Sequence, residues 1–345
     1  MTRWTPRIRA ALAKRHGALL ALLLISMATS ACAPQLRPQG PEIQPAHMTD
    51  SAVFTPDGAE LPLRQWVPAI DTPLAVMLAL HGFNDYSRAF EDPAPHLAAA
   101  GIAVYAYDQR GFGATASAGY WPGVATLVDD MRTVAGLLRD RHEGVPLILL
   151  GESMGGAVLL AAASNSVLPG ERIVLVAPAV RGRETMNPIY RAALWLSAHV
   201  MPWAEVTGRG LGIKASDNRD AIIKLRDDPL VIKRTRVDSI WGLVNLMDAA
   251  LAGARAIRQP ALCLYGANDM LIPSESTQLL YERLGTACRW GTYDSGWHML
   301  LRDHAAGIVL QDIAAWAQDP VATLPSGAEV RARRFFSEAK QDLGE

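Results

Sequence analysis

The chain has 345 residues, 50% of them hydrophobic, and its 33 Lys and Arg are balanced by 34 Asp and Glu. This length and apolar content suffice for one large domain with an insertion. The balanced charge gives no overall basic field of the kind that indicates a nucleic-acid-binding protein, so we expect no nucleic-acid partner. The 3 Cys residues are too few for a disulfide framework in a chain of this length.

The first 31 residues have the composition of an export signal. Five basic side chains precede an apolar run at 18–27, and the first acidic residue is Glu42. The apolar run is too short to span a membrane comfortably, so residues 1–31 are predicted to be a signal peptide. The small residues at 28–31, followed by Cys32, are similar to a bacterial lipoprotein processing site, in which the cysteine is lipidated. We therefore expect a membrane-anchored lipoprotein of the bacterial cell envelope; a secreted or periplasmic protein, or an uncleaved anchor, is the alternative.

Residues 32–50 are predicted to form a tether between the envelope and the folded domain. They contain four prolines, at positions 34, 38, 41 and 45, with Gln and Gly between them. This composition is typical of an extended linker. The folded domain itself is predicted over residues 51–318.

Strand and helix patterns alternate along the domain. A hairpin is predicted around Pro56-Asp57-Gly58, and the continuous apolar run at 74–80 is typical of a strand buried on both faces of a parallel sheet. Further strands are predicted at 102–107, 146–150, 173–176, 261–265 and 289–293, and helices at 88–100, 124–141, 157–163, 274–284 and 308–316. The alternation predicts an α/β fold with a doubly wound, mostly parallel sheet and helices on both faces.

The alternation breaks between residues 181 and 259. Helical patterns occur there at 189–201, 221–225 and 239–257, without a strongly strand-like run. We interpret residues 181–259 as an inserted helical lid over the carboxyl ends of the strands. The alternative is a set of helices that only complete the main core.

The last segment, residues 319–345, differs from the domain before it. It is polar, mixed in charge and weakly periodic. We predict a loose C-terminal tail that contains at most one marginal helix.

A serine stands at the sharpest predicted turn. The sequence Gly151-Glu152-Ser153-Met154-Gly155 lies between an apolar strand and a run of small residues that suits a helix. The two glycines stand where a side chain would block an abrupt strand–helix turn. In this context the pattern is typical of a nucleophile elbow, and an ordinary glycine-rich turn is the alternative. Because a serine hydroxyl is a poor nucleophile by itself, the chain should also supply a histidine and a carboxylate.

Asp269 and His298 stand where these partners are needed. Asp269 follows the predicted strand at 261–265, and His298 follows the strand at 289–293. The chain order Ser153, Asp269, His298 is the order of an α/β-hydrolase triad. Each residue alone has a structural alternative, a turn-capping carboxylate for Asp269 and a hydrogen-bonded structural histidine for His298. The prediction therefore depends on their combination.

Acyl transfer also needs donors for the carbonyl oxygen that becomes negatively charged. The backbone N–H of Met154, at the start of the elbow helix, is one candidate, and the N–H of Phe83 is the second. Phe83 follows His81-Gly82 after an early strand, and Gly82 would allow close approach of the backbone. As an alternative, His81-Gly82 only terminates that strand. The sequence implies no metal or organic cofactor, because the spacing of Cys and His does not match a zinc motif.

Six motifs occur in an order that resembles a known family. They are His81-Gly82, Asp108-Gln109-Arg110-Gly111-Phe112-Gly113, Gly151-Glu152-Ser153-Met154-Gly155-Gly156, Asp227-Asp228-Pro229-Leu230, Gly266-Ala267-Asn268-Asp269 and His298. Together they are similar to the monoglyceride lipase and lysophospholipase branch of the α/β-hydrolases, also described as serine aminopeptidase-like. The sequence departs from this branch at Glu152, where many members have histidine, and at Asn84, where many have a second glycine. The resemblance implies hydrolysis of acyl lipid esters.

The sequence thus predicts a serine hydrolase of carboxylic esters, such as monoacylglycerols or lysophospholipids. Ser153 would attack the ester carbonyl, His298 would transfer the proton, and Asp269 would hold His298. Trp195 and Trp241, in the predicted lid, would contact the substrate. The alternatives are an amide hydrolase, peptidase or acyltransferase with the same triad and, from another class, a non-catalytic binding protein with a hydrolase fold.

Overall fold

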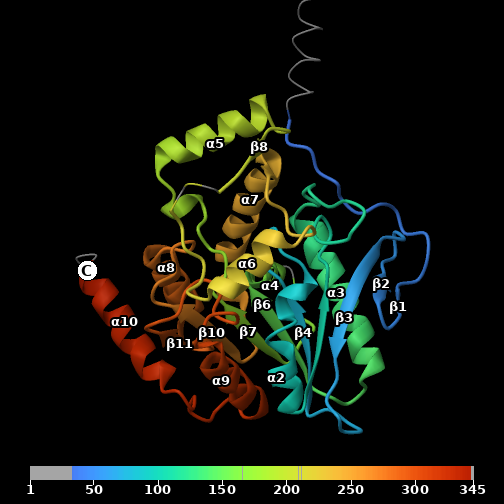
Figure 1. Ribbon diagram of the computed structural model, residues 1–345, viewed down its shortest axis with the longest axis vertical. Coiled ribbons are helices and arrows are strands. Elements are labelled where there is room, and N and C mark those ends of the chain that lie inside the picture. Colours follow the sequence, from blue (N-terminus) through green and yellow to red (C-terminus); the bar gives the residue numbers. More distant parts are fainter. Residues whose placement is uncertain (1–32, 165, 209, 211, 343–345) are drawn as a thin grey trace, which may run out of the picture.

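The computed structural model describes residues 33–164, 166–208, 210 and 212–342, so the predicted signal peptide and Cys32 lie outside the described residues. Within them, a nine-stranded sheet forms the centre of the molecule, with helices on both faces (Figure 1). Its strands are β1 (His47–Met48), β2 (Ala52–Phe54), β3 (Glu60–Trp66), β4 (Ala75–Leu80), β5 (Ile102–Tyr107), β6 (Leu147–Glu152), β7 (Arg172–Val176), β10 (Ala261–Gly266) and β11 (Cys288–Tyr293).

The strands lie in the order β1-β2-β3-β5-β4-β6-β7-β10-β11. Neighbours from β5 to β11 are parallel, and β1, β2 and β3 are joined antiparallel at one edge. A separate antiparallel pair consists of β8 (Glu205–Val206) and β9 (Thr235–Arg236). The predicted mostly parallel α/β sheet is confirmed, whereas the inserted segment is not entirely helical because it contains this pair.

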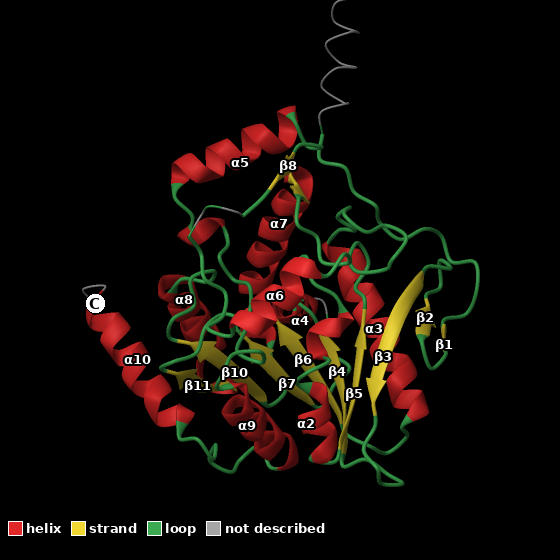
Figure 2. Cartoon of the chain, viewed as in Figure 1, coloured by secondary structure: helices red, strands yellow, loops and turns green. Residues whose placement is uncertain are grey.

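The helices surround the sheet on two sides (Figure 2). They are α2 (Ala94–Ala99), α3 (Val124–Arg141), α4 (Met154–Ala163), α5 (Pro188–Val200), α6 (Arg219–Asp227), α7 (Val237–Gly253), α8 (Ser274–Leu284), α9 (Ala306–Gln318) and α10 (Ala328–Asp342). Short 3-10 helices are η1 (Ser87–Phe90), η2 (Arg183–Thr185), η3 (Ala254–Ala256) and η4 (Gly285–Ala287). The helix predicted at 88–100 is divided into η1 and α2, because Pro93 and Pro95 lack the N–H that a continuous helix needs.

The sequence of strand β4 is a continuous apolar run because both faces of the strand are covered. All 6 of its residues are buried. Val76 and Leu78 belong to the core that contains α3, α4 and α7, whereas Met77 and Ala79 belong to the core that contains α2 and α9. Successive side chains of a strand point to opposite faces, so a strand covered on both faces is apolar at every position.

Helix α7 corrects the predicted extent of the lid. It packs along α4 in the main core, where Leu246 and Ala250 are fully buried. The two helices lie so close that a Cβ at Gly253 would be 2.0 Å from the Leu160 carbonyl oxygen. The alternative interpretation, helices that complete the core, is therefore correct for α7. We call the remaining part, residues 181–236, the cap segment.

Residues 33–50 are extended, as predicted, but they lie along the domain. Leu36 forms a bridge with Trp121, whose carbonyl oxygen also accepts a hydrogen bond of 2.9 Å from the Arg37 N–H. The Gly40 N–H donates to the Asp57 carboxylate at 2.8 Å. The described part of the predicted tether is thus attached to the surface of the domain.

The C-terminal segment also differs from the expected loose tail. Helix α10 packs against β11, and Arg331 donates a hydrogen bond of 3.0 Å to a carbonyl of that strand. Phe336 is buried among aromatic side chains in the core. The overlooked signal is the helical spacing of Ala328, Ala332 and Phe336, all of which are buried. The helix covers the edge strand of the sheet, which would otherwise expose unpaired backbone groups.

Candidate active site

Ser153 occupies the turn between β6 and α4. Its backbone has φ 51° and ψ −111°, a conformation that residues with a side chain rarely adopt. A Cβ at Gly151 would lie 2.4 Å from the Gly156 nitrogen, and a Cβ at Gly155 would lie 2.2 Å from the Leu80 carbonyl oxygen. The turn is therefore possible only with glycine at both positions, as the sequence pattern predicts.

His298 joins Ser153 to Asp269. Its Nε2 lies 2.9 Å from Ser153 Oγ, and its Nδ1 lies 2.7 Å from Asp269 Oδ2. The other carboxylate oxygen of Asp269 accepts hydrogen bonds from the N–H groups of Leu271 and Ile272, at 2.8 and 2.9 Å. These bonds hold the carboxylate, which in turn orients the imidazole. Three residues at the ends of three strands thus form one hydrogen-bonded chain.

The environment of His298 raises the pKa of its imidazole above the ordinary value. Burial is the largest effect and lowers the pKa, but the charge and hydrogen bond of Asp269 and the charge of Glu152 together outweigh it. A base with a raised pKa binds the serine proton more strongly. The imidazole is therefore suited to act as a general base whenever the pH leaves it neutral.

The two predicted oxyanion donors belong to two segments that meet at Ser153. Met154 is the first residue of α4, and Phe83 follows Gly82 in the loop after β4. This loop passes close to the serine, since a Cβ at Gly82 would lie 3.4 Å from Ser153 Cβ. Among the described residues, neither the Met154 N–H nor the Phe83 N–H donates a hydrogen bond to a protein acceptor. Both groups can therefore donate to a bound ligand.

Ser153 and His298 line a pocket of about 670 Å³, a volume typical of small-molecule sites. Most of its wall is apolar. Most of the apolar side chains come from the cap segment, which includes α6, from α7 and from the loop after β10: Met186, Ile213, Ile222, Leu225, Val231, Ile240, Leu243, Val244, Met247, Leu271 and Ile272. On α7 the lining residues recur at helical spacing, so one face of this helix forms a wall of the pocket.

Comparison with known proteins assigns the chain to a family. The sequence model of the family described as Serine aminopeptidase, S33, matches residues 71–305. The chain belongs to this serine aminopeptidase family. The monoacylglycerol lipase of Mycolicibacterium smegmatis is 27% identical to it over 256 residues, which cover 73% of this chain and 90% of the relative. The monoglyceride lipase of Mus musculus is 27% identical over 285 residues, covering 79% and 91%.

Solved structures show the same fold. A monoacylglycerol lipase from Paleococcus ferrophilus has a TM-score of 0.63 and 22% identity, covering 75% of this chain and 98% of that one. A soluble variant of the Saccharomyces cerevisiae monoglyceride lipase, in complex with a substrate analog, has a TM-score of 0.65 and 18% identity, covering 84% and 99%. The resemblance to the monoglyceride lipase branch of the α/β-hydrolases is thus confirmed, and this member of the serine aminopeptidase family is a carboxylic ester hydrolase.

Asn84 replaces the glycine that many serine aminopeptidase family members have after His-Gly-x. Its φ is 66°, a left-handed value that asparagine tolerates better than most residues. Its side chain donates a hydrogen bond of 2.7 Å to Thr235 Oγ1, and its carbonyl accepts one of 3.0 Å from the Ile232 N–H. The substitution therefore keeps the turn of the loop and also links it to the cap segment.

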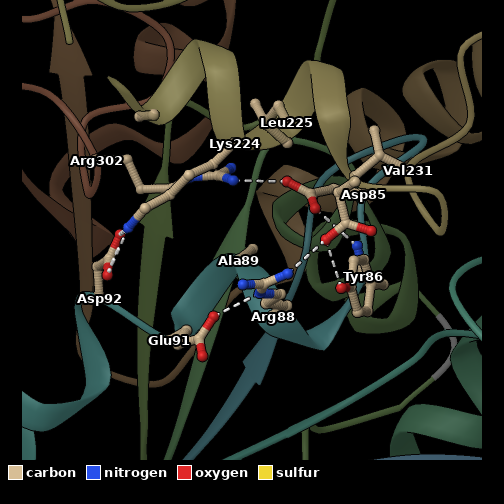
Figure 3. A pocket seen from close by; sticks show the side chains of 12 residues that line it. Asp85, Tyr86, Arg88, Ala89, Glu91, Asp92, Lys224, Leu225, Val231 and Arg302 are labelled. Carbon is tan, nitrogen blue, oxygen red and sulfur yellow. Dashed lines mark hydrogen bonds and ion pairs between the residues drawn. The ribbon is translucent and has the colours of Figure 1, made fainter. Parts of the chain in front are cut away.

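Another family motif, Asp227-Asp228-Pro229-Leu230, attaches α6 to the loop after β4. The Asp228 carboxylate accepts hydrogen bonds from Tyr86 at 2.7 Å and from Arg88 at 2.9 Å. Nearby, Lys224 of α6 pairs with Asp92 at 2.9 Å. Asp228 lines a small pocket between the helix and the loop, in which Figure 3 labels Tyr86, Arg88, Asp92 and Lys224. The motif thus has a structural role: it holds α6 beside the pocket that Ser153 and His298 line.

Glu152, the other departure from the family pattern, belongs to a buried ion-pair cluster. Arg302 donates to Glu152 at 3.2 Å and to Asp85 at 2.7 Å, as the dashed line to Asp85 in Figure 3 shows. Burial, the largest effect, raises the pKa of Glu152, although Arg302 opposes this. The cluster joins the loop that carries His298 to the end of β6 and to the loop after β4. Asp85 and Arg302 could not be predicted from the sequence, because a pairing between residues so distant along the chain leaves no local pattern.

Trp195 and Trp241 are not among the residues that line the pocket of Ser153 and His298, so the structure does not support their predicted contact with the substrate. Trp195 is 53% exposed and stacks on His199, with ring centroids 4.6 Å apart. Trp241 lies on a different face of α7, where the Arg183 guanidinium is 4.2 Å from its ring centroid. Its neighbour Ile240 lines the pocket instead. Adjacent residues of a helix point in directions about 100° apart, so the helical period could have identified the correct side chains.

Proposed function

We propose that the protein hydrolyses esters of long-chain acyl groups, such as monoacylglycerols or lysophospholipids, through Ser153, His298 and Asp269. One observation carries the proposal: the hydrogen-bonded chain of these three residues presents Ser153 and His298 to a large pocket with a mainly apolar wall. Ser153 Oγ attacks the ester carbonyl while His298 accepts its proton, and His298 then donates that proton to the leaving alcohol. A water molecule, activated by the same imidazole, releases the acid from the acyl-enzyme.

Phe83 and Met154 complete this mechanism through their backbone N–H groups. They donate to the negative oxygen of the tetrahedral intermediate, and each such donor typically contributes about 3–4 kcal/mol to stabilisation of the transition state. Labelling with a fluorophosphonate probe tests the nucleophile directly. We expect stoichiometric labelling of Ser153 and complete loss of labelling in Ser153→Ala. Labelling at another residue would contradict the proposal.

The apolar wall supports a long acyl chain as substrate. Each buried methylene contributes up to about 0.8 kcal/mol, or about fourfold in binding. We therefore expect kcat/KM for p-nitrophenyl esters to rise from acetate towards laurate and then to level off when the pocket is full. Leu243→Ala should weaken the longer esters more than acetate, whereas Trp195→Ala, outside the pocket, should leave the profile unchanged. A flat profile would exclude the long-chain substrate and leave the serine mechanism intact. Assays with monoacylglycerols and lysophospholipids then distinguish the head groups.

We also propose that Cys32 is lipidated and anchors the protein to a bacterial envelope membrane. The support is the basic and apolar composition of residues 1–31 and the small residues directly before Cys32. Mass spectrometry of the mature N-terminus should find a diacylglycerol-modified Cys32, and Cys32→Ala should block processing or release the protein from membranes. A mature chain that begins elsewhere and carries no lipid would contradict this proposal.

A further inference from the structure

Asn84 connects two parts of the protein that both border the substrate. One is the loop after β4, which carries the backbone N–H of Phe83; the other is the cap segment, which forms part of the wall of the pocket at Ser153. We call this pocket the catalytic pocket. The connection consists of two hydrogen bonds. Asn84 Nδ2 donates to Thr235 Oγ1 at 2.7 Å, and the Ile232 N–H donates to the Asn84 carbonyl at 3.0 Å.

The backbone at Asn84 shows that this connection is more than a consequence of the turn. Residues 82–85 form a turn that is closed by a hydrogen bond of 3.3 Å between its last N–H and its first carbonyl. Asn84 is the third residue of this turn and has φ 66°, a value that glycine adopts without strain. The asparagine therefore adds something that the turn does not need, and its side chain supplies the bond to Thr235.

The other attachments of this turn lead to the body of the domain. The Phe83 ring packs against Phe112 and Trp121, with centroids 5.6 and 6.2 Å away. Asp85, at the end of the turn, accepts a hydrogen bond of 2.7 Å from Arg302. The turn is thus held at three points, and its middle is the point that the cap segment holds. A displacement of that point would tilt the peptide group that contains the Phe83 N–H.

The same part of the cap segment faces the substrate. Val231, directly before Ile232, lines the catalytic pocket. It also lines the small pocket of Figure 3 together with Asp85 and Tyr86, so it lies against the loop after β4. An acyl chain that fills the catalytic pocket would contact Val231, one residue from the N–H that binds Asn84. Contacts that hold the cap segment in place would therefore also hold the turn.

We propose that Asn84 is a positioning residue that couples the cap segment to the oxyanion site. Its two bonds to the cap segment place the Phe83 N–H where it donates to the negative oxygen of the tetrahedral intermediate. A longer acyl chain stabilises this arrangement through the cap segment, so chain length increases kcat as well as affinity, because the gain is realised in the transition state. The proposal rests on the proposed function, since it needs Phe83 as a donor. It adds a residue and a coupling that ester hydrolysis by itself does not require.

The side-chain bond is tested with p-nitrophenyl butyrate. We expect Asn84→Gly and Thr235→Val to lower kcat by about tenfold with little change in KM. The loss is smaller than the roughly 10²–10³ for removal of an oxyanion donor, because the donor is only displaced. Thr235→Ser keeps the hydroxyl and should retain the parent value. An alkyl trifluoromethyl ketone, whose adduct with Ser153 carries an oxyanion, should bind Asn84→Gly and Thr235→Val more weakly by the same factor as kcat falls.

Tyr86→Phe provides the matched control. It removes the bond of 2.7 Å to Asp228, which also joins this loop to the cap segment but lies outside the turn at 82–85. We expect its kcat and its affinity for the ketone to equal those of the parent. An equal loss in Tyr86→Phe, an equal loss in Thr235→Ser, or unchanged kcat and ketone binding in Asn84→Gly would each overturn the proposal. Complete labelling of Ser153 by a fluorophosphonate after long incubation shows that each variant is folded; absence of labelling in the parent would instead contradict the proposed function.

The coupling to chain length is tested by comparing the parent with Asn84→Gly on esters from butyrate to laurate. In the parent we expect kcat to rise and KM to fall as the chain lengthens. In Asn84→Gly, KM should still fall but kcat should no longer rise. A parent kcat that does not depend on chain length, or a rise that Asn84→Gly preserves, would overturn the coupling. Because the fall in KM reports the apolar wall by itself, the long-chain substrate can be correct when the coupling is absent, and the two failures are distinguishable.

Discussion

Helices α4 and α5 both consist mainly of apolar residues, yet α4 is buried and α5 is exposed. All 10 residues of α4 are buried, whereas only one of the 13 residues of α5 is. Helix α4 lies between the sheet and α7, and Gly155 brings it into contact with the backbone of β4. Helix α5 has no comparable cover among the described residues. An apolar helix is therefore expected to be covered by something. Only the arrangement of the fold shows whether the protein's own core covers it.

The largest expected difference between the two helices concerns catalysis. Ser153→Ala, at the start of α4, should reduce kcat/KM for a soluble ester by about 10⁴–10⁶, because the members of a catalytic triad act as a unit. Leu196→Ala on α5 should leave this value unchanged. Steady-state kinetics with p-nitrophenyl butyrate measures both, and melting temperatures check that both variants are folded. Residual activity of Ser153→Ala close to that of the parent would contradict the assignment of the nucleophile.

The next difference concerns stability. Leu159 of α4 is completely buried, whereas Leu196 of α5 is 56% exposed. Leu159→Ala should lower the free energy of unfolding by about 2–5 kcal/mol, because it removes buried methyl groups and leaves a cavity. Leu196→Ala should change it by less than about 0.5 kcal/mol, as is usual at the surface. Urea unfolding of the two variants in the absence of lipid gives both values. A large loss of stability for Leu196→Ala would mean that α5 packs against protein in solution.

The sequence predicted the parts of the site that depend on local pattern. The elbow around Ser153 follows from glycines that only a sharp turn requires, and the positions of Asp269 and His298 follow from the rule that parallel strands end at one edge. The strands and most helices were predictable for the same reason, since each has its own periodicity. The hydrogen-bonded chain itself needed the structure, because only the packing of the sheet brings these residues within reach of one another.

The errors arose where tertiary packing selects among equally apolar segments. Trp195 and Trp241 are the larger side chains, but the pocket is lined by the face of α7 that carries Ile240 and Val244. Helix α7 belongs to the stretch in which the strand–helix alternation breaks, and this break predicts a lid, but its contact with α4 places it in the core. Residues 319–345 look polar on average, and this average concealed the buried stripe of α10. For the pocket wall and for α10 the helical period held information that composition lacks, whereas the place of α7 depends on its contact with α4.

The smallest effect that we predict is a shift in the pH profile of kcat/KM. It should follow the loss of a buried carboxylate but not the loss of an exposed one. Glu152 is buried beside the elbow, and its charge contributes to the raised pKa of His298. Removing this charge in Glu152→Gln makes the imidazolium less stable and therefore lowers the pKa of His298. Because the base must be neutral to accept the serine proton, the acid limb of the pH profile of kcat/KM should move to lower pH.

Glu184 provides the matched control for this prediction. It lies in η2, just before α5, and its side chain is 54% exposed and pairs with Arg283. Water and salt screen such a charge, so Glu184→Gln should leave the acid limb where it is in the parent enzyme. Profiles for the parent and both variants, recorded at constant ionic strength, make the comparison. A limb that stays in place or moves to higher pH in Glu152→Gln would show that His298 does not sense this carboxylate. An equally large shift of the acid limb in Glu184→Gln would show that the effect of Glu152 on the pKa of His298 does not depend on its burial.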